Sequence, residues 1–319
     1  MPKILISTSS FNVNANGYLD ILQREGFEID QNPYGRRLTE SEVMELLHDD
    51  VVGLIAGVEP LTQAVIVSAK KLKVISRCGI GMDSVDSVAA KKHEIQVYNT
   101  PGAPVDAVAE LSIALILSLL RKVVEADRNI RQGGWKPLMG NLLSCQTVGV
   151  IGYGRIGKRV SQLLQAFGSK VIVFDEQEVP DEPGIEVYPM NDVLRQADIV
   201  TLHVPYSSST HHLIDHEKIS RMKSGAILIN SSRGGVIDEQ ALLSALQSGA
   251  LAGAGLDAFE EEPYQGPLLK LPQVVLTAHM GSYAKEARMN MENEAAKNLL
   301  MGLRSKGIVG EHVGMSDEG

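Results

Sequence analysis

Short apolar runs alternate with stretches of helical periodicity along most of the chain. In the first hundred residues the apolar runs lie at residues 3–7, 53–56, 73–76 and 96–98. Amphipathic stretches with a helical period lie between them, at residues 16–25, 39–48 and 63–70. This alternation predicts parallel strands joined by helices that cover both faces of a sheet.

The alternation is interrupted once and then resumes. Residues 99–104 contain two prolines and a glycine, and a long helical pattern follows over about residues 105–132. After Gly133 and Gly134, further strand candidates lie at residues 147–151, 170–174, 199–203, 226–230, 255–257 and 274–277. A last helical pattern covers about residues 284–304.

The whole pattern predicts an α/β protein with two doubly wound parallel-sheet domains of Rossmann or flavodoxin-like type and a cleft between them. The first domain is predicted to be discontinuous, with residues 1–100 and 286–319, because the final helix returns to it. The second domain is predicted to cover residues 101–285. Folds of this kind usually bind their ligands in such a cleft.

Composition narrows the classes of partner. The net charge of −9 argues against nucleic acid, which needs a basic face. The most apolar run, residues 111–120, is about half the ~20 residues that a membrane helix needs, so we expect a buried helix and no membrane partner. Cys78 and Cys145 lie far apart, and residues 1–7 lack the features of a signal peptide. We therefore expect a reduced, cytoplasmic protein.

A glycine-rich turn joins one strand of the second domain to a helix. Residues 147–151 run into Gly152, Gly154 and Gly157 in a G-x-G-x-x-G pattern, and a helical pattern follows. Gly152 permits the tight bend, Gly154 lets the backbone approach a pyrophosphate, and Gly157 lets the helix pack closely on the strand. The helix N-terminus then faces the phosphates, so the turn predicts a dinucleotide site.

The next strand, residues 170–174, ends in Asp175, at the distance along the chain expected for the acid that holds the adenosine ribose. A carboxylate there accepts hydrogen bonds from the ribose hydroxyls and repels a 2′-phosphate. The three residues that follow include no arginine. These features predict NAD rather than NADP, with Arg155 as a further donor to the pyrophosphate.

Three polar side chains follow three successive strands of the second domain: Arg233, Glu262 and His279. The carboxyl ends of parallel strands meet at one edge of a sheet, so these side chains are expected to converge on the cofactor crevice. Each alone is more often structural than catalytic. In this order, beside a nucleotide turn, they indicate an active site.

The ordered motifs together resemble the D-isomer-specific 2-hydroxyacid dehydrogenases, and among them the phosphoglycerate dehydrogenase branch in a short form without its regulatory domain. The resemblance covers about residues 54–288. Its motifs are Arg77-Cys78-Gly79-Ile80-Gly81-Met82-Asp83, Asn99-Thr100-Pro101-Gly102, the glycine turn, His203-Val204-Pro205 and the segments that carry Arg233, Glu262 and His279.

The resemblance implies an NAD-dependent oxidoreductase that interconverts a small D-2-hydroxy acid and its 2-keto acid. Arg233 is implied to bind the substrate carboxylate and keto oxygen, and His279 to be the general acid in keto reduction. Glu262, which stands directly before a proline, is implied to orient the imidazole. The implied cofactor site comprises Gly152, Gly154, Arg155, Ile156, Gly157, Asp175, Val204, Pro205, Ser232 and Asp257, the last of them at the nicotinamide carboxamide.

The first domain is expected to hold the substrate carboxylate with Arg77, Gly79 and Ile80, because the glycines of this segment leave backbone N–H groups free to point at an anion. Phosphoglycerate enzymes add a cation in the loop after the strand at residues 53–56. Here that loop has Glu59 and no arginine. The sequence therefore leaves 3-phosphoglycerate open beside unphosphorylated acids such as glycerate, hydroxypyruvate, glyoxylate and lactate.

Three further expectations complete the interpretation. The resemblance implies a homodimer formed through the long helix after Pro101 and the segment around Trp135. An NAD(H)-sensing corepressor-like interaction protein on the same scaffold is the alternative function, although such proteins usually carry extended tails. No metal site is expected, although His212 and His216 are one helical turn apart, because no cysteine is near them.

Overall fold

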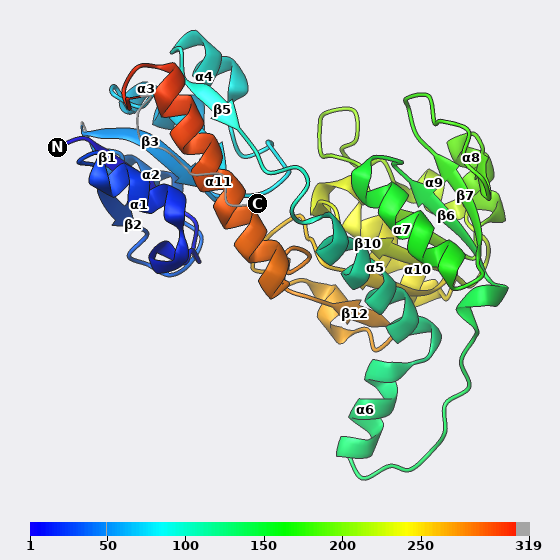
Figure 1. Ribbon diagram of the computed structural model, residues 1–319. Helices are drawn as coiled ribbons and strands as arrows, with labels where there is room; N and C mark the ends of the chain where they lie inside the picture. The colour runs from blue at the N-terminus through cyan, green and yellow to red at the C-terminus, as the bar shows by residue number, and fades with distance from the viewer. Residues whose placement is uncertain (49, 311–319) are drawn as a thin grey trace. The chain divides into compact units, whose positions relative to one another are not determined.

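The protein is described by a computed structural model that covers residues 1–48 and 50–310 (Figure 1). The chain divides into two compact units. Unit 1 consists of Met1–Pro104 and the chain from Ala284 onward, and unit 2 consists of Val105–Tyr283. Each unit contains a parallel sheet with helices on both faces, which confirms the predicted fold class.

Unit 1 has a five-stranded parallel sheet in the order β2-β1-β3-β4-β5. Its strands are β1 (Lys3–Ile6), β2 (Glu28–Gln31), β3 (Val51–Ala56), β4 (Val74–Arg77) and β5 (Gln96–Tyr98). Its helices are α1 (Gly17–Arg24), α2 (Glu40–Leu46), α3 (Gln63–Ser68), α4 (Ser87–Lys92) and α11 (Lys285–Ser305), with a short 3₁₀ turn at Val13–Ala15.

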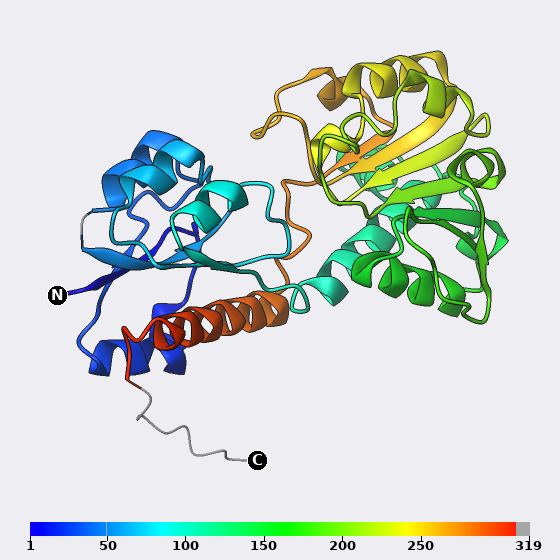
Figure 2. The same ribbon diagram turned by 90° about the horizontal axis from the view of Figure 1, so that it is seen from above.

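Alternate residues of the strands of unit 1 face opposite layers of helix, as the two-residue period of a strand requires. Ile4 and Ile6 pack with α1 and α11, whereas Leu5 packs with α2, α3 and α4. Figure 2 shows α11 and α1 on one side of this sheet and the other helices on the opposite side. A Cβ on Gly53 would lie 2.8 Å from Ile4 and 2.9 Å from Leu299, so this glycine lets α11 approach β3 closely.

Unit 2 has a seven-stranded parallel sheet in the order β12-β11-β10-β9-β6-β7-β8. Its strands are β6 (Thr147–Ile151), β7 (Lys170–Phe174), β8 (Ile185–Val187), β9 (Ile199–Leu202), β10 (Ala226–Asn230), β11 (Leu251–Leu256) and β12 (Val274–Leu276). Its helices are α5 (Val105–Leu120), α6 (Val123–Arg131), α7 (Arg155–Ala166), α8 (Met190–Gln196), α9 (His216–Ser220) and α10 (Glu239–Ser248). Short 3₁₀ turns lie at Leu143–Cys145, Gly234–Val236 and Pro267–Lys270.

The strand order of unit 2 places its ligand crevice. The chain runs from β6 outward through β7 and β8, and then crosses to β9 on the other side of β6. Open α/β sheets bind ligands beyond the carboxyl ends of the strands at this kind of switch point. Helices α5 and α7 cover one face of the sheet, and α8, α9 and α10 cover the other.

The predicted long helix over residues 105–132 is wrong in one respect, because it is two helices. α5 ends at Leu120 and α6 begins at Val123, and Lys122 between them has a left-handed backbone with a φ of 53°. Such a residue interrupts a helix. Figure 1 shows α6 and the segment after it projecting away from the sheet of unit 2. Within the described residues, no helix is both long and apolar enough to cross a membrane.

Candidate active site

The glycine turn joins β6 to α7. Gly152 has a φ of 93°, and a Cβ placed on it would lie 2.6 Å from the carbonyl oxygen of His203. A Cβ on Gly157 would lie 1.9 Å from the carbonyl oxygen of Gly152, so both positions require glycine. Gly154 is the N-cap of α7. The first N–H groups of this helix therefore face the turn, where a phosphate fits.

The two residues between Gly154 and Gly157 differ in exposure. Arg155 is exposed in the first turn of α7, and Ile156 is half-buried and packs against the core under α5 and α7. The exposed guanidinium is available to an anion at the helix N-terminus. Ile156 instead anchors this turn of helix in the core.

Asp175 follows β7 and bonds to the glycine turn. Its Oδ2 accepts a hydrogen bond from the Tyr153 N–H at 2.6 Å, and its Oδ1 accepts one from the Gln177 N–H at 2.8 Å. Each carboxylate oxygen has a further lone pair for a ribose hydroxyl. Burial raises the pKa of Tyr153 to about 12, so its phenol stays protonated beside Glu182. The turn and this carboxylate together fit NAD.

The end of β9 lies on the other side of the glycine turn. Nε2 of His203 lies 2.9 Å from Oγ1 of Thr201, and its Nδ1 is buried without a hydrogen-bond partner among the described residues. Burial lowers the pKa of His203 to about 3, so the ring is neutral near pH 7. Val204 Cγ1 would lie 2.9 Å from a Cβ on Gly152, and Pro205 is exposed.

A buried asparagine organises the loop that carries Arg233. Asn230 is the last residue of β10 and is 1% exposed. Its Oδ1 accepts hydrogen bonds from the N–H and the hydroxyl of Ser232, at 3.0 and 2.7 Å. Its Nδ2 donates to the Arg233 carbonyl at 2.8 Å, and Arg233 Nη1 donates to the Ser232 carbonyl at 2.9 Å. The backbone of the arginine loop is therefore held from the strand that precedes it.

The same loop packs on two other parts of unit 2. The hydroxyls of Ser231 and Ser112 lie 2.7 Å apart, and Ser112 also donates to the Val108 carbonyl within α5. A Cβ on Gly234 would lie 1.8 Å from the carbonyl carbon of Phe259, in the loop after β11. Glycine at this position lets the arginine loop and the glutamate loop lie in contact.

His279 and Glu262 form a close pair. Nδ1 of His279 lies 2.9 Å from each carboxylate oxygen of Glu262, and their side chains are 35% and 28% exposed. Glu262 Oε1 also accepts a hydrogen bond from the Phe259 N–H at 3.1 Å. His279 has a left-handed backbone with a φ of 49°, a conformation uncommon outside glycine and often found at functional sites. Of the three consecutive glutamates, Glu262 is therefore the one that contacts this histidine.

Asp257 holds the loop on which His279 stands. It is 1% exposed and accepts hydrogen bonds from the Thr277 hydroxyl at 2.6 Å and from the N–H groups of Met280 and Gly281 at 2.8 Å each. These donors flank the left-handed histidine on both sides. The carboxylate predicted to face the nicotinamide is thus also bonded to the histidine loop.

Arg233, Glu262 and His279 come from loops that follow β10, β11 and β12, which are neighbours in the sheet. The structure brings all three to the same edge of unit 2. Sequence analysis missed Asn230, which fixes the arginine loop. Its only signal was an amide at the end of an otherwise apolar strand.

In unit 1 the segment predicted to bind the substrate carboxylate differs from the expectation. Arg77 is 6% exposed, and its Nη1 donates to the Cys78 carbonyl at 2.8 Å. The Gly79 N–H donates to Thr100 Oγ1 at 2.8 Å. The expectation of a free Gly79 N–H is therefore wrong, because the threonine hydroxyl already accepts from it. Ile80 is half-buried, and its carbonyl accepts a hydrogen bond from Asn99 Nδ2 at 2.8 Å.

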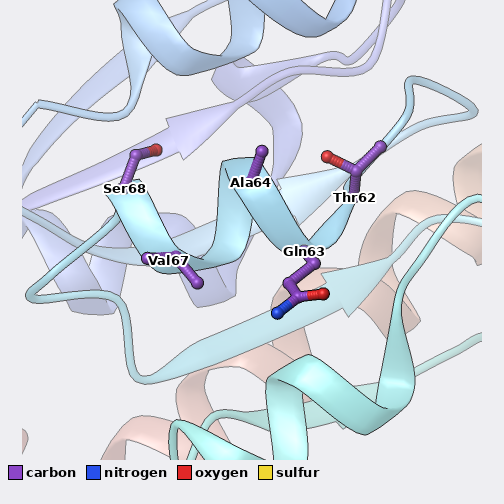
Figure 3. A pocket seen from close by; sticks show the side chains of 5 residues that line it. All are labelled: Thr62, Gln63, Ala64, Val67 and Ser68. Atoms are coloured by element: carbon purple, nitrogen blue, oxygen red, sulfur yellow. The ribbon is translucent and has the colours of Figure 1, made fainter.

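A surface depression of about 660 Å³ lies elsewhere in unit 1, over α3 (Figure 3). Its lining consists of Thr62, Gln63, Ala64, Val67 and Ser68. None of these side chains is charged, and none belongs to the predicted site. The depression therefore has no part in the chemistry argued here. His212 stacks on His211 and bonds to Glu260, and His216 begins α9.

Comparison with known proteins identifies the family. Residues 113–281, more than half of the chain, match the model of the D-isomer specific 2-hydroxyacid dehydrogenase NAD binding domain. A glyoxylate reductase of Thermococcus litoralis is 44% identical over 246 residues, which are 73% of this chain and 74% of the relative. A hydroxypyruvate reductase of Thermotoga maritima is 35% identical over 301 residues, 91% of this chain and 97% of the relative.

Phosphoglycerate and lactate enzymes are also similar. A D-3-phosphoglycerate dehydrogenase of Methanocaldococcus jannaschii is 40% identical over 282 residues, 85% of this chain and 54% of the longer relative. The crystal structure of a D-lactate dehydrogenase from Aquifex aeolicus with NAD and lactic acid has a TM-score of 0.84 at 29% identity and covers 96% of each chain. These relatives do not support the corepressor alternative. The chain belongs to the D-isomer specific 2-hydroxyacid dehydrogenase family, and it is an NAD-dependent oxidoreductase that interconverts small 2-hydroxy acids and 2-keto acids.

Proposed function

We propose that the protein reduces a small unphosphorylated 2-keto acid, glyoxylate or hydroxypyruvate, with NADH, and that Arg233, Glu262 and His279 carry the reaction. The observation that carries the proposal is the pairing of His279 Nδ1 with both oxygens of Glu262 at 2.9 Å, on the sheet edge that also presents the Arg233 loop. An imidazole oriented by a carboxylate is the usual arrangement of a general acid or base.

Each residue has one task in this mechanism. Arg233 binds the substrate carboxylate and the keto oxygen through its planar set of N–H donors. The hydride that reaches C2 of the substrate is supplied by bound NADH. His279 donates a proton from Nε2 to the keto oxygen, because Nδ1 is directed to Glu262. Glu262 fixes the tautomer and the orientation of the ring.

The cofactor is held by unit 2. The glycine turn and Asp175 hold the pyrophosphate and ribose, with Arg155, Val204, Pro205, Ser232 and Asp257 completing the cofactor site. In unit 1 the proposed substrate-binding residues are Arg77 and Ile80, in the segment that also contains Gly79. The bonds from Gly79 to Thr100 and from Asn99 to Ile80 fix this segment and support the assignment.

The preference for an unphosphorylated substrate is supported by the loop after β3. Glu59 is 1% exposed, and its Oε1 accepts hydrogen bonds from the Gly57 N–H at 2.9 Å and from the Ser7 hydroxyl. An inward carboxylate thus stands in the loop where a phosphoglycerate enzyme is expected to carry a cation. Relatives named glyoxylate reductase and hydroxypyruvate reductase support the same preference.

We also propose that the protein is a cytoplasmic homodimer. The segment that projects from unit 2 exposes large apolar side chains, among them Trp135 at 87% and Met139 at 88%. Ile130 and Leu142 add to this surface, at 54% and 61% exposed. Such an apolar surface is costly in water unless another chain covers it. Cys78 and Cys145 are free thiols, as a reducing compartment favours.

The proposal is tested by following NADH oxidation with a panel of glyoxylate, hydroxypyruvate, pyruvate and 3-phosphohydroxypyruvate. We expect turnover of the first two, a loss of at least ~1000-fold in kcat for His279→Ala, and an unchanged Kd for NADH. Selective turnover of the phosphorylated acid would contradict the substrate assignment. Retained turnover in His279→Ala would contradict the mechanism. Light scattering measures the oligomeric state, and Trp135→Ser with Met139→Ser is expected to give monomers.

A further inference from the structure

A second histidine–glutamate pair uses a carboxylate from the loop that carries Glu262. Nε2 of His212 lies 2.8 Å from Oε1 of Glu260, two residues before Glu262. Glu261 between the two acids is exposed. Two acids of one short loop are therefore paired with two different histidines, Glu260 with His212 and Glu262 with His279.

Glu260 is also tied to the N-terminus of α10. Its N–H donates to Glu239 Oε1 at 2.8 Å, and its own Oε1 lies 3.5 Å from the Glu239 N–H that donates to it. The two residues thus bond reciprocally through backbone and side chain. Burial raises the pKa of Glu239, and the charges of Glu260 and Glu261 raise it further. The imidazole of His212 bonds to the Glu260 carboxylate at this same place.

His212 projects from a firmly held turn. Its backbone is left-handed, with a φ of 50°, and its N–H donates to the Gly235 carbonyl at 2.8 Å. Its ring stacks on that of His211 with centroids 3.9 Å apart, and the Tyr206 hydroxyl lies 3.2 Å from Nδ1 of His211. Tyr206 in turn packs on Gly235, where a Cβ would lie 2.6 Å from its ring. Backbone and ring contacts therefore fix the position of the His212 imidazole independently of its bond to Glu260.

The backbone next to Glu260 leads directly to the catalytic pair. Phe259 precedes it, and the Phe259 N–H donates to Glu262 Oε1 at 3.1 Å. The same backbone is in contact with Gly234, next to Arg233. A displacement of Glu260 would therefore move both a donor to Glu262 and a neighbour of the arginine loop.

We propose that His212, Glu260 and Glu239 form a positioning clamp that holds Glu262 in line with His279. The inference rests on the proposed catalytic role of Glu262, and it assigns no contact between the clamp and the substrate or the cofactor. The clamp acts on the proton-transfer step through the donor that Phe259 gives to Glu262, which in turn pairs with His279. A misplacement of about 1 Å in such a constellation lowers rates by up to ~100-fold.

The test uses His212→Asn and His212→Gln in the full-length enzyme. Asparagine tolerates the left-handed backbone but is too short to reach Glu260, whereas glutamine restores an N–H donor at that reach. We expect His212→Asn to lower kcat for keto-acid reduction by about 10-fold, to leave the KM for NADH unchanged and to raise the solvent deuterium isotope effect on kcat. His212→Gln is expected to recover most of the loss.

Glu261→Gln is the matched control, and we expect wild-type kcat for it. It removes one carboxylate charge from the loop of Glu260 and Glu262, at an exposed position. Adding Glu260→Ala to His212→Asn should cost little beyond the single change, because the pair acts together. A kcat for His212→Asn within twofold of wild type would overturn the clamp, provided that Glu262→Gln is impaired. Equal losses in both His212 variants, with a changed KM for NADH, would also overturn it. An active Glu262→Gln would instead refute the proposed function.

Discussion

Arg77 and Arg233 occupy matching places in the two units, and the structure treats them in opposite ways. Arg77 ends β4 and Arg233 lies in the loop after β10, and a glycine follows Arg77 after one residue and Arg233 directly. Each Nη1 donates to a carbonyl of its own loop, but Arg77 is 6% exposed whereas Arg233 is half-buried on the edge shared with His279. Position at a strand end therefore does not decide whether an arginine serves a ligand or the fold.

The neighbouring glycines account for the difference. A Cβ on Gly79 would lie 1.2 Å from Nη1 of Arg77, so this glycine, with a φ of 146°, makes room for the arginine itself. A Cβ on Gly234 would instead strike the backbone of Phe259. In unit 1 the missing side chain admits the guanidinium. In unit 2 it admits the neighbouring loop.

The largest effect expected from this contrast is the loss of activity in Arg233→Ala. Without its guanidinium, kcat/KM for the keto acid should fall by about 1000-fold or more, because two charge-assisted hydrogen bonds to the substrate disappear. The melting temperature should change little, since the loop backbone is held by Asn230. Steady-state kinetics and thermal unfolding measure the two quantities. Arg233→Lys is the control and should recover part of the activity, because lysine keeps the charge but not the planar donors.

Arg77→Met should lower stability more than Arg233→Ala does. It removes a buried donor to the Cys78 carbonyl, so we expect the free energy of unfolding to fall by about 2 kcal/mol. The same substitution at Arg233 provides the matched control and should cost less, because the donor that it removes from the Ser232 carbonyl is half-buried rather than buried. Urea unfolding measures both. If Arg77→Met unfolded like wild type but lost its turnover, the arginine would be a direct substrate ligand and the contrast would fail.

The central strands and the glycine turn were predictable because their signals are local. β1, β4, β6 and β10 are apolar runs between helical patterns, and all appear where the sequence predicts them. Sequence analysis missed β2 and β8, which lie at the sheet edges. Three of the four residues of β2 are polar, and β8 has only three residues, of which two are exposed, so no long apolar run marks either strand.

The sequence predicts which strand ends carry the candidate site, but not which hydrogen bonds its side chains form. The pairing of His279 with Glu262, rather than with Glu260 or Glu261, depends on the path of a short loop that no periodicity describes. The bond of His212 to Glu260 joins residues 48 positions apart, so residue spacing gives no sign of it, and the local bonds of Asn230 depend on the path of the loop after β10. The sequence therefore predicts where the candidate side chains lie, and the structure shows which residues they contact.

Two histidines that follow strands of unit 2 repeat the arginine contrast on a smaller scale. His279 is partly exposed and pairs with a carboxylate, whereas His203 has a buried ring nitrogen and only a threonine hydroxyl beside it. Burial lowers the pKa of His203 from its ordinary value of 6.5 to about 3. In the unfolded chain the same ring takes up a proton near pH 6.5. The stabilising contribution of the neutral, buried ring is therefore complete above that pH and is lost as the pH falls toward 3.

The smallest predicted effect follows from the direction of this pKa shift. Because half of the unfolded-state rings are already protonated at pH 6.5, the free energy of unfolding should fall through His203 by about 1 kcal/mol between pH 6.5 and 5.5, and by about 1.4 kcal/mol for the next pH unit. Urea unfolding of wild type and His203→Gln at these two pH values isolates the effect, because every other titrating group is common to both proteins. The glutamine keeps a polar partner for Thr201 but does not titrate, so its stability should depend less on pH. An equal loss in both proteins would mean that the strand-end histidine is accessible to protons, and burial would no longer separate it from His279.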